Sequence, residues 1–249
     1  LTLDGKELLV PITMARHYDS SSLVHLNPDT LKITKSMDID PRISYNHVIP
    51  MAGRKIWLGS TVDWRNLLEY PSLAIKSVPL MYDAQILRSR DSTLLVIGSD
   101  YSSSDGFYSF DGRTMVARNI SAPYLRERQA DISTTGNRII IRKNIYNQDF
   151  DLLGELSNLE NDFLLAVAPK GDFAYVAAQT NDSSYIFRRY NISANQGPYS
   201  AENLSFTLDY ENIPVLLRVT DDGKALIVLT VHYITADQPQ GHFNVFPLP

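Results

Sequence analysis

The sequence predicts an all-β fold built from repeated four-stranded antiparallel units, and two features of its 249 residues support this prediction. One is a turn rich in Gly, Asp and Lys, followed at once by a short run of β-forming residues, which occurs six times. The other is the near absence of helical periodicity. The six β runs begin at residues 8, 56, 94, 139, 174 and 226, a mean spacing of about 44 residues that is typical of a supersecondary repeat.

The elements follow one order in each repeat. An apolar stretch comes before the turn and the β run after it, so the two predict a hairpin whose Gly supplies the positive φ that the turn requires. A polar loop, a third alternating stretch, a second turn and a more polar fourth strand complete the unit. The six turns are residues 4–6, 52–54, 90–92, 135–137, 170–172 and 222–224. The β runs that follow them are residues 8–10, 56–58, 94–96, 139–141, 174–176 and 226–228.

Polarity that rises toward the last strand predicts the blades of a β-propeller, because the inner strands of a blade are buried on both faces while its outer strand meets solvent. The alternative is a sandwich of two sheets, which also contains many short strands and turns. Six recurrences of one hairpin favour the blades. The first repeat lacks its innermost strand and the last stops after its third. We interpret residues 63–70, which could form one or two helical turns, as a loop insertion.

Several segments resemble the repeat of the β-propeller superfamily, in particular bacterial proteins with YVTN-type or WD-like repeats. They are LDGKELLV, TGNRIII, PKGDFAYVAA and DDGKALIVL, together with SLVHLNPDTLKITKSMDI for the third strand, second turn and fourth strand. The resemblance covers nearly the whole chain and assigns neither subfamily. It implies a single propeller domain over residues 1–249, with six repeats visible and six or seven blades. Because the sequence starts inside a repeat, we expect it to be a fragment of a longer chain.

Composition and charge exclude several classes of function. Acidic residues outnumber basic ones by 28 to 23, so a net charge of −5 offers no basic surplus for nucleic acid or anionic lipid. The absence of cysteine excludes disulfides, a thiol nucleophile and thiolate metal sites. The apolar runs have the length of strands, far below the roughly 20 residues of a membrane helix. We therefore expect no nucleic-acid partner and no membrane insertion.

Candidate binding residues lie in the loops that follow the second strand of each repeat. Five of these six loops place an aromatic residue beside a polar or charged one. Aromatic and Arg side chains on a rigid rim are the usual anchors of a recognition surface. The alternative is that these aromatics cap the hydrophobic core of each blade. The candidate rim consists of His17, Tyr18, Trp64, Arg65, Tyr101, Tyr146, His232 and Tyr233.

The sequence shows no pattern of a catalytic or metal site. Its five histidines have no ligand spacing, and it contains neither a Gly-x-Ser-x-Gly elbow nor a Gly-x-Gly-x-x-Gly turn. Asn46, Asp83 and Glu211 fall in connections between blades, where the oxygens of a lactonase-like metal site would gather, but no spacing singles them out. We predict no catalytic residue, no metal and no cofactor.

These observations favour a non-catalytic binding module that recognises a protein or glycan through the aromatic-polar loops. Two alternatives stay open. One is a propeller enzyme that uses the central channel, either a metal-dependent lactonase-like hydrolase or a quinoprotein-like oxidoreductase. The other is a structural spacer of a large surface protein that contacts neighbouring domains of the parent chain. The resemblance, the missing cysteines and the abundance of Ser, Asn and Tyr indicate an extracytoplasmic location: periplasmic, secreted or cell-surface.

Overall fold

A computed structural model describes most of the chain, and the structural statements below concern the residues it describes. These are residues 6, 8–13, 21–39, 47–52, 55–59, 66–69, 74–77, 84–99, 107–111, 117–120, 129–159, 163–180, 184–208, 212–235 and 238–248. They contain 22 β-strands and no helix, which confirms the all-β prediction. No helix long and apolar enough to cross a membrane is found among the described residues.

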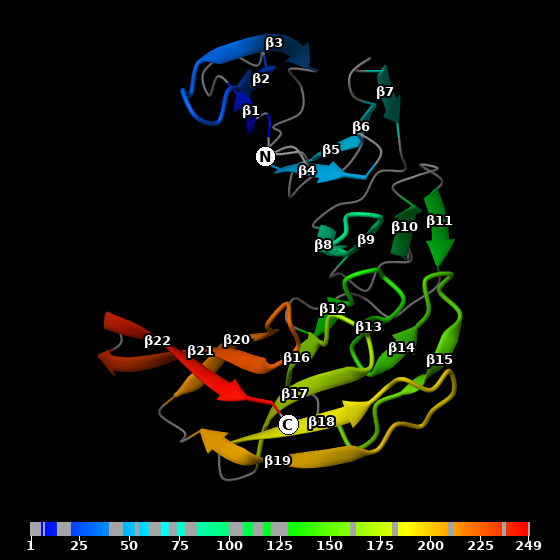
Figure 1. Ribbon diagram of the computed structural model, residues 1–249, viewed down its shortest axis with the longest axis vertical. Helices are drawn as coiled ribbons and strands as arrows, with labels where there is room; N and C mark the ends of the chain where they lie inside the picture. Colours follow the sequence, from blue (N-terminus) through cyan, green and yellow to red (C-terminus); the bar gives the residue numbers. More distant parts are fainter. Residues whose placement is uncertain are drawn as a thin grey trace. The chain divides into compact units, whose positions relative to one another are not determined.

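The strands form six antiparallel sheets among the described residues, each a meander in which strands adjacent in sequence pair (Figure 1). Four sheets have four strands: β4 (His47–Met51), β5 (Lys55–Gly59), β6 (Asn66–Glu69) and β7 (Ala74–Ser77); β8 (Ala84–Arg88), β9 (Leu94–Ser99), β10 (Phe107–Asp111) and β11 (Ala117–Ile120); β12 (Ala130–Ile132), β13 (Ile139–Ile141), β14 (Asn144–Tyr146) and β15 (Leu152–Glu155); β16 (Phe163–Val167), β17 (Phe173–Gln179), β18 (Tyr185–Asn191) and β19 (Ala201–Leu208). Two sheets have three: β1 (Leu8–Thr13), β2 (Ser21–Leu26) and β3 (Ile33–Ile39); β20 (Ile213–Val219), β21 (Ala225–Thr235) and β22 (Gln238–Pro247).

The predicted turn-and-strand repeat is confirmed, since the strand after each predicted turn begins within one residue of the expected position. These strands are β1, β5, β9, β13, β17 and β21. The first and last sheets in sequence order have three strands each in the described part of the chain, at the two repeats that were predicted to be incomplete.

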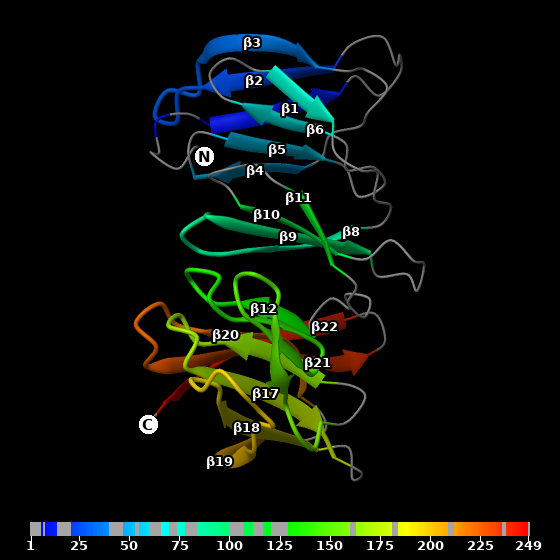
Figure 2. The same ribbon diagram turned by 90° about the vertical axis from the view of Figure 1, so that its right-hand side faces the viewer.

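The chain forms two compact units. The first comprises Leu1–Ile86 and Asp91–Tyr124, and the second comprises Leu87–Arg90 and Leu125–Pro249. In the first unit, Leu9, Leu23 and Met51 are among the buried residues. The second unit holds three sheets, β12–β15, β16–β19 and β20–β22, and Figure 2 shows it from a second direction.

The sheet β16–β19 is buried on both faces in its inner strands, as predicted for a blade. Phe163, Leu165 and Val167 of β16 belong to a cluster that includes residues of β13 and β14. Leu164 and Ala166 belong to a second cluster, which includes residues of β20 and β21. Because successive side chains of a strand point to opposite faces, this alternation places β16–β19 between its two neighbouring sheets.

The turns between first and second strands share one geometry in the second unit. In the turns that begin at Ser133, Ala168 and Thr220, the first residue donates its N–H to the carbonyl oxygen five residues later, at 2.9, 2.8 and 2.9 Å. The fourth residue is Gly136, Gly171 or Gly223, with φ of 76°, 75° and 74°. A residue with a Cβ adopts this conformation only at a cost, so the structure explains the glycines by which the repeat was found.

Residues of two adjacent sheets interlock at these turns. The Arg138 side chain is 9% exposed and donates from Nε to the carbonyl oxygen of Ile192 at 3.0 Å. Its Nη2 donates to the carbonyl oxygen of Ser193 at 3.0 Å and to Oδ1 of Asn195 at 2.8 Å. One side chain of the turn before β13 therefore binds the loop that follows β18 in the next sheet.

Three segments that were expected to be loops are strands, and these expectations are wrong. Residues 66–69 form β6 and pair with β5, where a loop insertion with a helical turn was expected. A single turn of helix satisfies few of its own backbone groups, whereas a strand beside β5 gains ladder hydrogen bonds. Asn144 to Tyr146 form β14 directly after a two-residue turn at Arg142, whose φ is 57°. His232 and Tyr233 lie within β21, opposite Gln240 and Pro239 of β22.

Candidate functional site

A cavity of about 270 Å³ lies along the first strands of four sheets. Its lining comes from β8, β12, β16 and β20, and all the lining residues belong to the second unit. Two of them are charged, Asp131 and Arg218. The others are Ala130 and six larger aliphatic residues: Leu87, Leu164, Leu165, Val215, Leu216 and Leu217.

The repeat itself brings the charged residues to this cavity. Asp131 lies two residues before the turn that begins at Ser133, and Arg218 lies two residues before the turn that begins at Thr220. Both therefore occupy the same position in their repeats. Strands β12 and β20 both contact β16, so the carboxylate and the guanidinium belong to strands on either side of β16.

Asp131 joins β12 to β16. Its Oδ2 accepts the backbone N–H of Val167 at 2.7 Å. Burial raises the pKa of the Asp131 carboxyl above its ordinary value. The hydrogen bond from Val167, the backbone of Ile132 and the positive charges of Arg218 and Arg90 oppose the rise. The carboxylate therefore occupies an apolar place where its charge is costly, and the nearby arginines reduce that cost.

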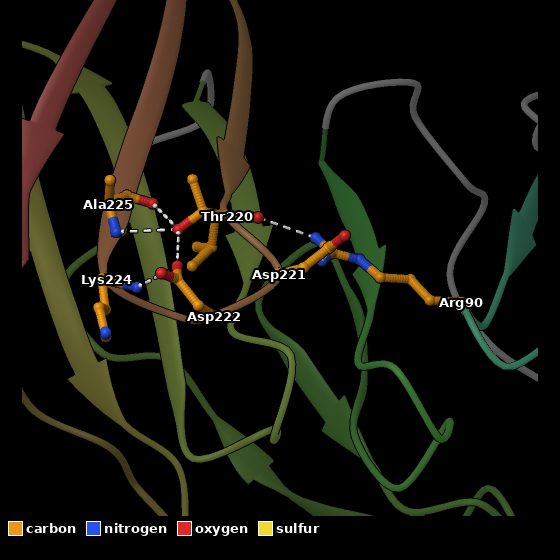
Figure 3. Close-up of polar contacts among 7 residues, drawn as sticks. Arg90, Thr220, Asp221, Asp222, Lys224 and Ala225 are labelled. Atoms are coloured by element: carbon orange, nitrogen blue, oxygen red, sulfur yellow. Dashed lines mark hydrogen bonds and ion pairs between the residues drawn. The ribbon is translucent and has the colours of Figure 1, made fainter.

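Arg90 binds the turn that follows β20 (Figure 3). Its Nη2 donates to the carbonyl oxygen of Val219 at 2.9 Å, and its Nη1 pairs with the Asp221 carboxylate. Within the turn, Oγ1 of Thr220 donates to Oδ1 of Asp222 at 2.7 Å, and this bond is the main reason why the pKa of Asp222 lies below its ordinary value. The turn is thus stabilised by hydrogen bonds among its own residues and by Arg90, which lies in the connection between β8 and β9.

Among the residues that the structure describes, none accepts a hydrogen bond from the Arg218 guanidinium. Arg218 is exposed, and its guanidinium makes no hydrogen bond or ion pair with any residue that the structure describes. Its interaction with Asp131 is electrostatic only. A guanidinium carries five N–H donors in a planar fork, so Arg218 can bind a carboxylate that enters the cavity.

The raised pKa of Asp131 makes a prediction about stability. The folded state holds the Asp131 proton more tightly than the unfolded state does, so this residue makes the free energy of unfolding fall as pH rises from about 4 through the raised pKa. Asp131→Asn keeps an acceptor for the Val167 N–H and removes the charge. We expect the variant to lose this decline and to gain stability relative to the wild type between pH 4 and 7 in urea titrations. Parallel pH profiles for the two proteins would contradict the assignment.

Among the predicted rim residues, Tyr146 is the best described, and it is buried. It is 6% exposed on β14, its hydroxyl accepts a hydrogen bond from Nδ2 of Asn144 at 3.2 Å, and its ring lies tilted against Phe150. Burial raises the pKa of the Tyr146 hydroxyl. This placement matches the alternative interpretation, in which the aromatics of the rim close the core of a sheet.

His232 is half-buried on β21, and Tyr233 follows it in the same strand. The other rim residues lie outside the described residues, so their role stays a prediction; they are His17, Tyr18, Trp64, Arg65 and Tyr101. The candidate channel oxygens Asn46, Asp83 and Glu211 also lie outside them. The described part of the chain holds no group of three or more His, Asp or Glu side chains placed to bind a metal ion.

The cavity residues were not predicted. Their signal in the sequence is a charged residue two positions before a turn, inside a stretch that is otherwise apolar, as at Asp131 and Arg218. Aligning the repeats on their turns places both residues at one position. A single charge in a β stretch is more often at the surface, so this signal becomes meaningful only when the strand is known to be an inner one.

Comparison with known proteins shows the fold. No protein-family model and no curated protein matches the sequence. Among solved structures, the Dos1 propeller has a TM-score of 0.55 and 15% identity over 91% of this chain and 63% of its own. A prolyl endopeptidase has a TM-score of 0.56 and 11% identity over 97% of this chain and 40% of its own.

Hydrazine synthase of Kuenenia stuttgartiensis has a TM-score of 0.55 and 10% identity over 79% of this chain and 60% of its own. The chain spans less than two thirds of the length of each of these three proteins. With the antiparallel sheets described above, these likenesses identify the fold as a β-propeller, as predicted. They do not assign the chain to the YVTN-type or WD-like group.

Proposed function

We propose that the chain is a non-catalytic β-propeller binding module that holds a protein partner in the cavity of its first strands. The observation that carries this proposal is the lining of the cavity, which is aliphatic except for Asp131 and Arg218. Aliphatic side chains beside polar main-chain and charged groups suit a peptide, which offers both an apolar side chain and backbone hydrogen-bonding groups. The hydroxyl groups of a glycan would find only two polar side chains in this lining, so the side chains favour a protein over a glycan as the partner.

The size of the cavity supports an anchoring role. Its volume of about 270 Å³ lies below the roughly 300–1,000 Å³ of ordinary small-molecule sites. A cavity of this size suits one anchoring side chain of a larger partner, and such anchors supply much of the affinity of protein interfaces. The predicted aromatic rim stays part of the proposal as a separate contact surface for the partner. An extracytoplasmic location remains part of the proposal.

Methyl NMR tests the proposed function. Protein labelled at Leu and Val methyls is titrated to millimolar concentration with the capped peptide acetyl-Ala-Leu-Ala-amide and, separately, with maltose. We expect the peptide, and not maltose, to shift the methyl signals of Leu87, Leu164 and Leu165. Leu31 and Val245 are 64% and 62% exposed outside the cavity, so their methyls report non-specific apolar contact. Shifts at these two alone, or no shifts at all, would refute the proposal.

A further inference from the structure

We infer that the cavity recognises the C-terminal residue of its partner, an aliphatic residue whose free carboxylate binds Arg218 and whose backbone N–H binds Asp131. This inference rests on the proposed function, because it names the part of the partner that the same cavity receives. Three properties of the cavity lead to it: an available guanidinium, a carboxylate with spare acceptor capacity and a leucine-rich wall between them.

Arg218 selects for a carboxylate. It lines the cavity at an exposed position, and the residues described around it supply no anion within ion-pair distance. The other arginine close to Asp131, Arg90, is already occupied by Asp221 and by the Val219 carbonyl. An arginine and a carboxylate make two parallel hydrogen bonds in their best geometry, which a neutral amide cannot reproduce. A free C-terminus is the carboxylate that every protein chain carries.

Asp131 selects for a donor. An ionised carboxylate has about four acceptor positions. The backbone N–H of Val167 takes one of them through Oδ2, and the backbone of Ile132 also stabilises the ionised carboxylate. The remaining positions would favour an N–H group, and the backbone N–H of a terminal residue lies on the other side of its Cα from the carboxylate. Asp131 and Arg218 belong to strands on either side of β16, so they can bind these two groups of one residue.

The wall between the two charges selects the side chain. Leu164 and Leu165 of β16 line the cavity between β12 and β20, and both are buried, at 7% and 5% exposed. A leucine, isoleucine or valine side chain would remove apolar surface from water there, whereas a lysine or aspartate side chain would lose its hydration. The cavity therefore matches an aliphatic residue at the end of a chain.

Calorimetric titration with matched peptides tests the inference. Acetyl-Ala-Ala-Leu with a free carboxylate is compared with the same peptide as its C-terminal amide and with acetyl-Ala-Ala-Lys. We expect the free acid to bind at least about tenfold more tightly than either, as expected for loss of a charge-assisted hydrogen-bond pair. Leu-Ala-Ala-amide, which presents an N-terminal leucine, is expected to bind no better than the amide.

Variants assign the roles. Arg218→Gln should reduce the ratio of acid to amide affinity from about ten to about one while leaving the amide unchanged, which a general disturbance of the fold would not do. Lys143→Gln, at an exposed residue outside the cavity, serves as the control and should keep the full ratio. Acid and amide peptides of equal affinity in the wild type would overturn the inference. If capped peptides still shift the cavity methyls in that case, the proposed function stands without it; if no peptide does, both fall.

Discussion

Arg138→Met is expected to lower the free energy of unfolding of the second unit by about 3 kcal/mol. The arginine makes three hydrogen bonds to the loop after β18, through Ile192, Ser193 and Asn195. Methionine fills much of the space but offers no donor, so the carbonyl oxygen of the fully buried Ile192 would lose a partner. A buried acceptor without a partner costs more than the mean value of a hydrogen bond. Urea unfolding monitored by far-UV circular dichroism, which reports the loss of β-structure, measures the change.

Lys143→Met is the matched control for this prediction. It removes the same charge and introduces the same residue, but Lys143 is 58% exposed and, among the described residues, forms an ion pair with the half-exposed Glu155 alone. Exposed ion pairs contribute about 0–1 kcal/mol, so the control should unfold close to the wild type. An Arg138 variant as stable as the Lys143 variant would show that the buried hydrogen bonds do not hold the two sheets together.

Gly171→Ala is expected to destabilise the protein by about 1–2 kcal/mol more than Gly223→Ala. Both glycines occupy the fourth position of the repeated turn, with φ of 75° and 74°, so both variants meet the same backbone cost of about 1 kcal/mol. They differ in their surroundings. A Cβ at Gly171 would lie 2.7 Å from Oδ1 of Asn137 and 2.8 Å from Cγ of Arg138, whereas a Cβ at Gly223 would meet nothing within 4 Å.

The two alanine variants therefore separate backbone conformation from packing. Asn137 could turn aside, but Arg138 is held by its hydrogen bonds, so the contact at Gly171 cannot be relieved without disturbing them. Ser92 has a φ of 60° in the corresponding turn after β8, which shows that a residue with a Cβ can stand at this position. Equal destabilisation of the two variants in urea unfolding would mean that the turn containing Gly171 does not pack tightly against Asn137 and Arg138.

The fold was predictable from local signals. A hairpin turn needs a positive φ at a defined position, and Gly136, Gly171 and Gly223 mark that position in the sequence as they do in the structure. Strand ends were less predictable. Tyr146 was assigned to a loop after the second strand of its repeat, yet Arg142 lies in a two-residue turn and the third strand starts directly after it.

The candidate site was predictable only in part. The aromatic loops stand out in the sequence because aromatic and Arg side chains on a rim are the usual anchors of recognition surfaces, but Tyr146 is buried against Phe150. Asp131 and Arg218 do not stand out, because one charge in a strand resembles any surface residue. They matter because the strands that carry them are the first strands of their sheets and line one cavity.

The sequence by itself determined the hairpin repeat, the all-β class and the propeller blades, because turn chemistry and strand alternation depend on neighbouring residues. Only the tertiary structure decided which charged residues line the same cavity. Asp131 and Arg218 are distant in the chain, and they share a cavity because successive sheets pack on both faces of β16–β19 and bring equivalent positions of the repeat to either side of β16. The cavity forms only when the sheets pack against one another, and this packing depends on contacts between residues far apart in sequence.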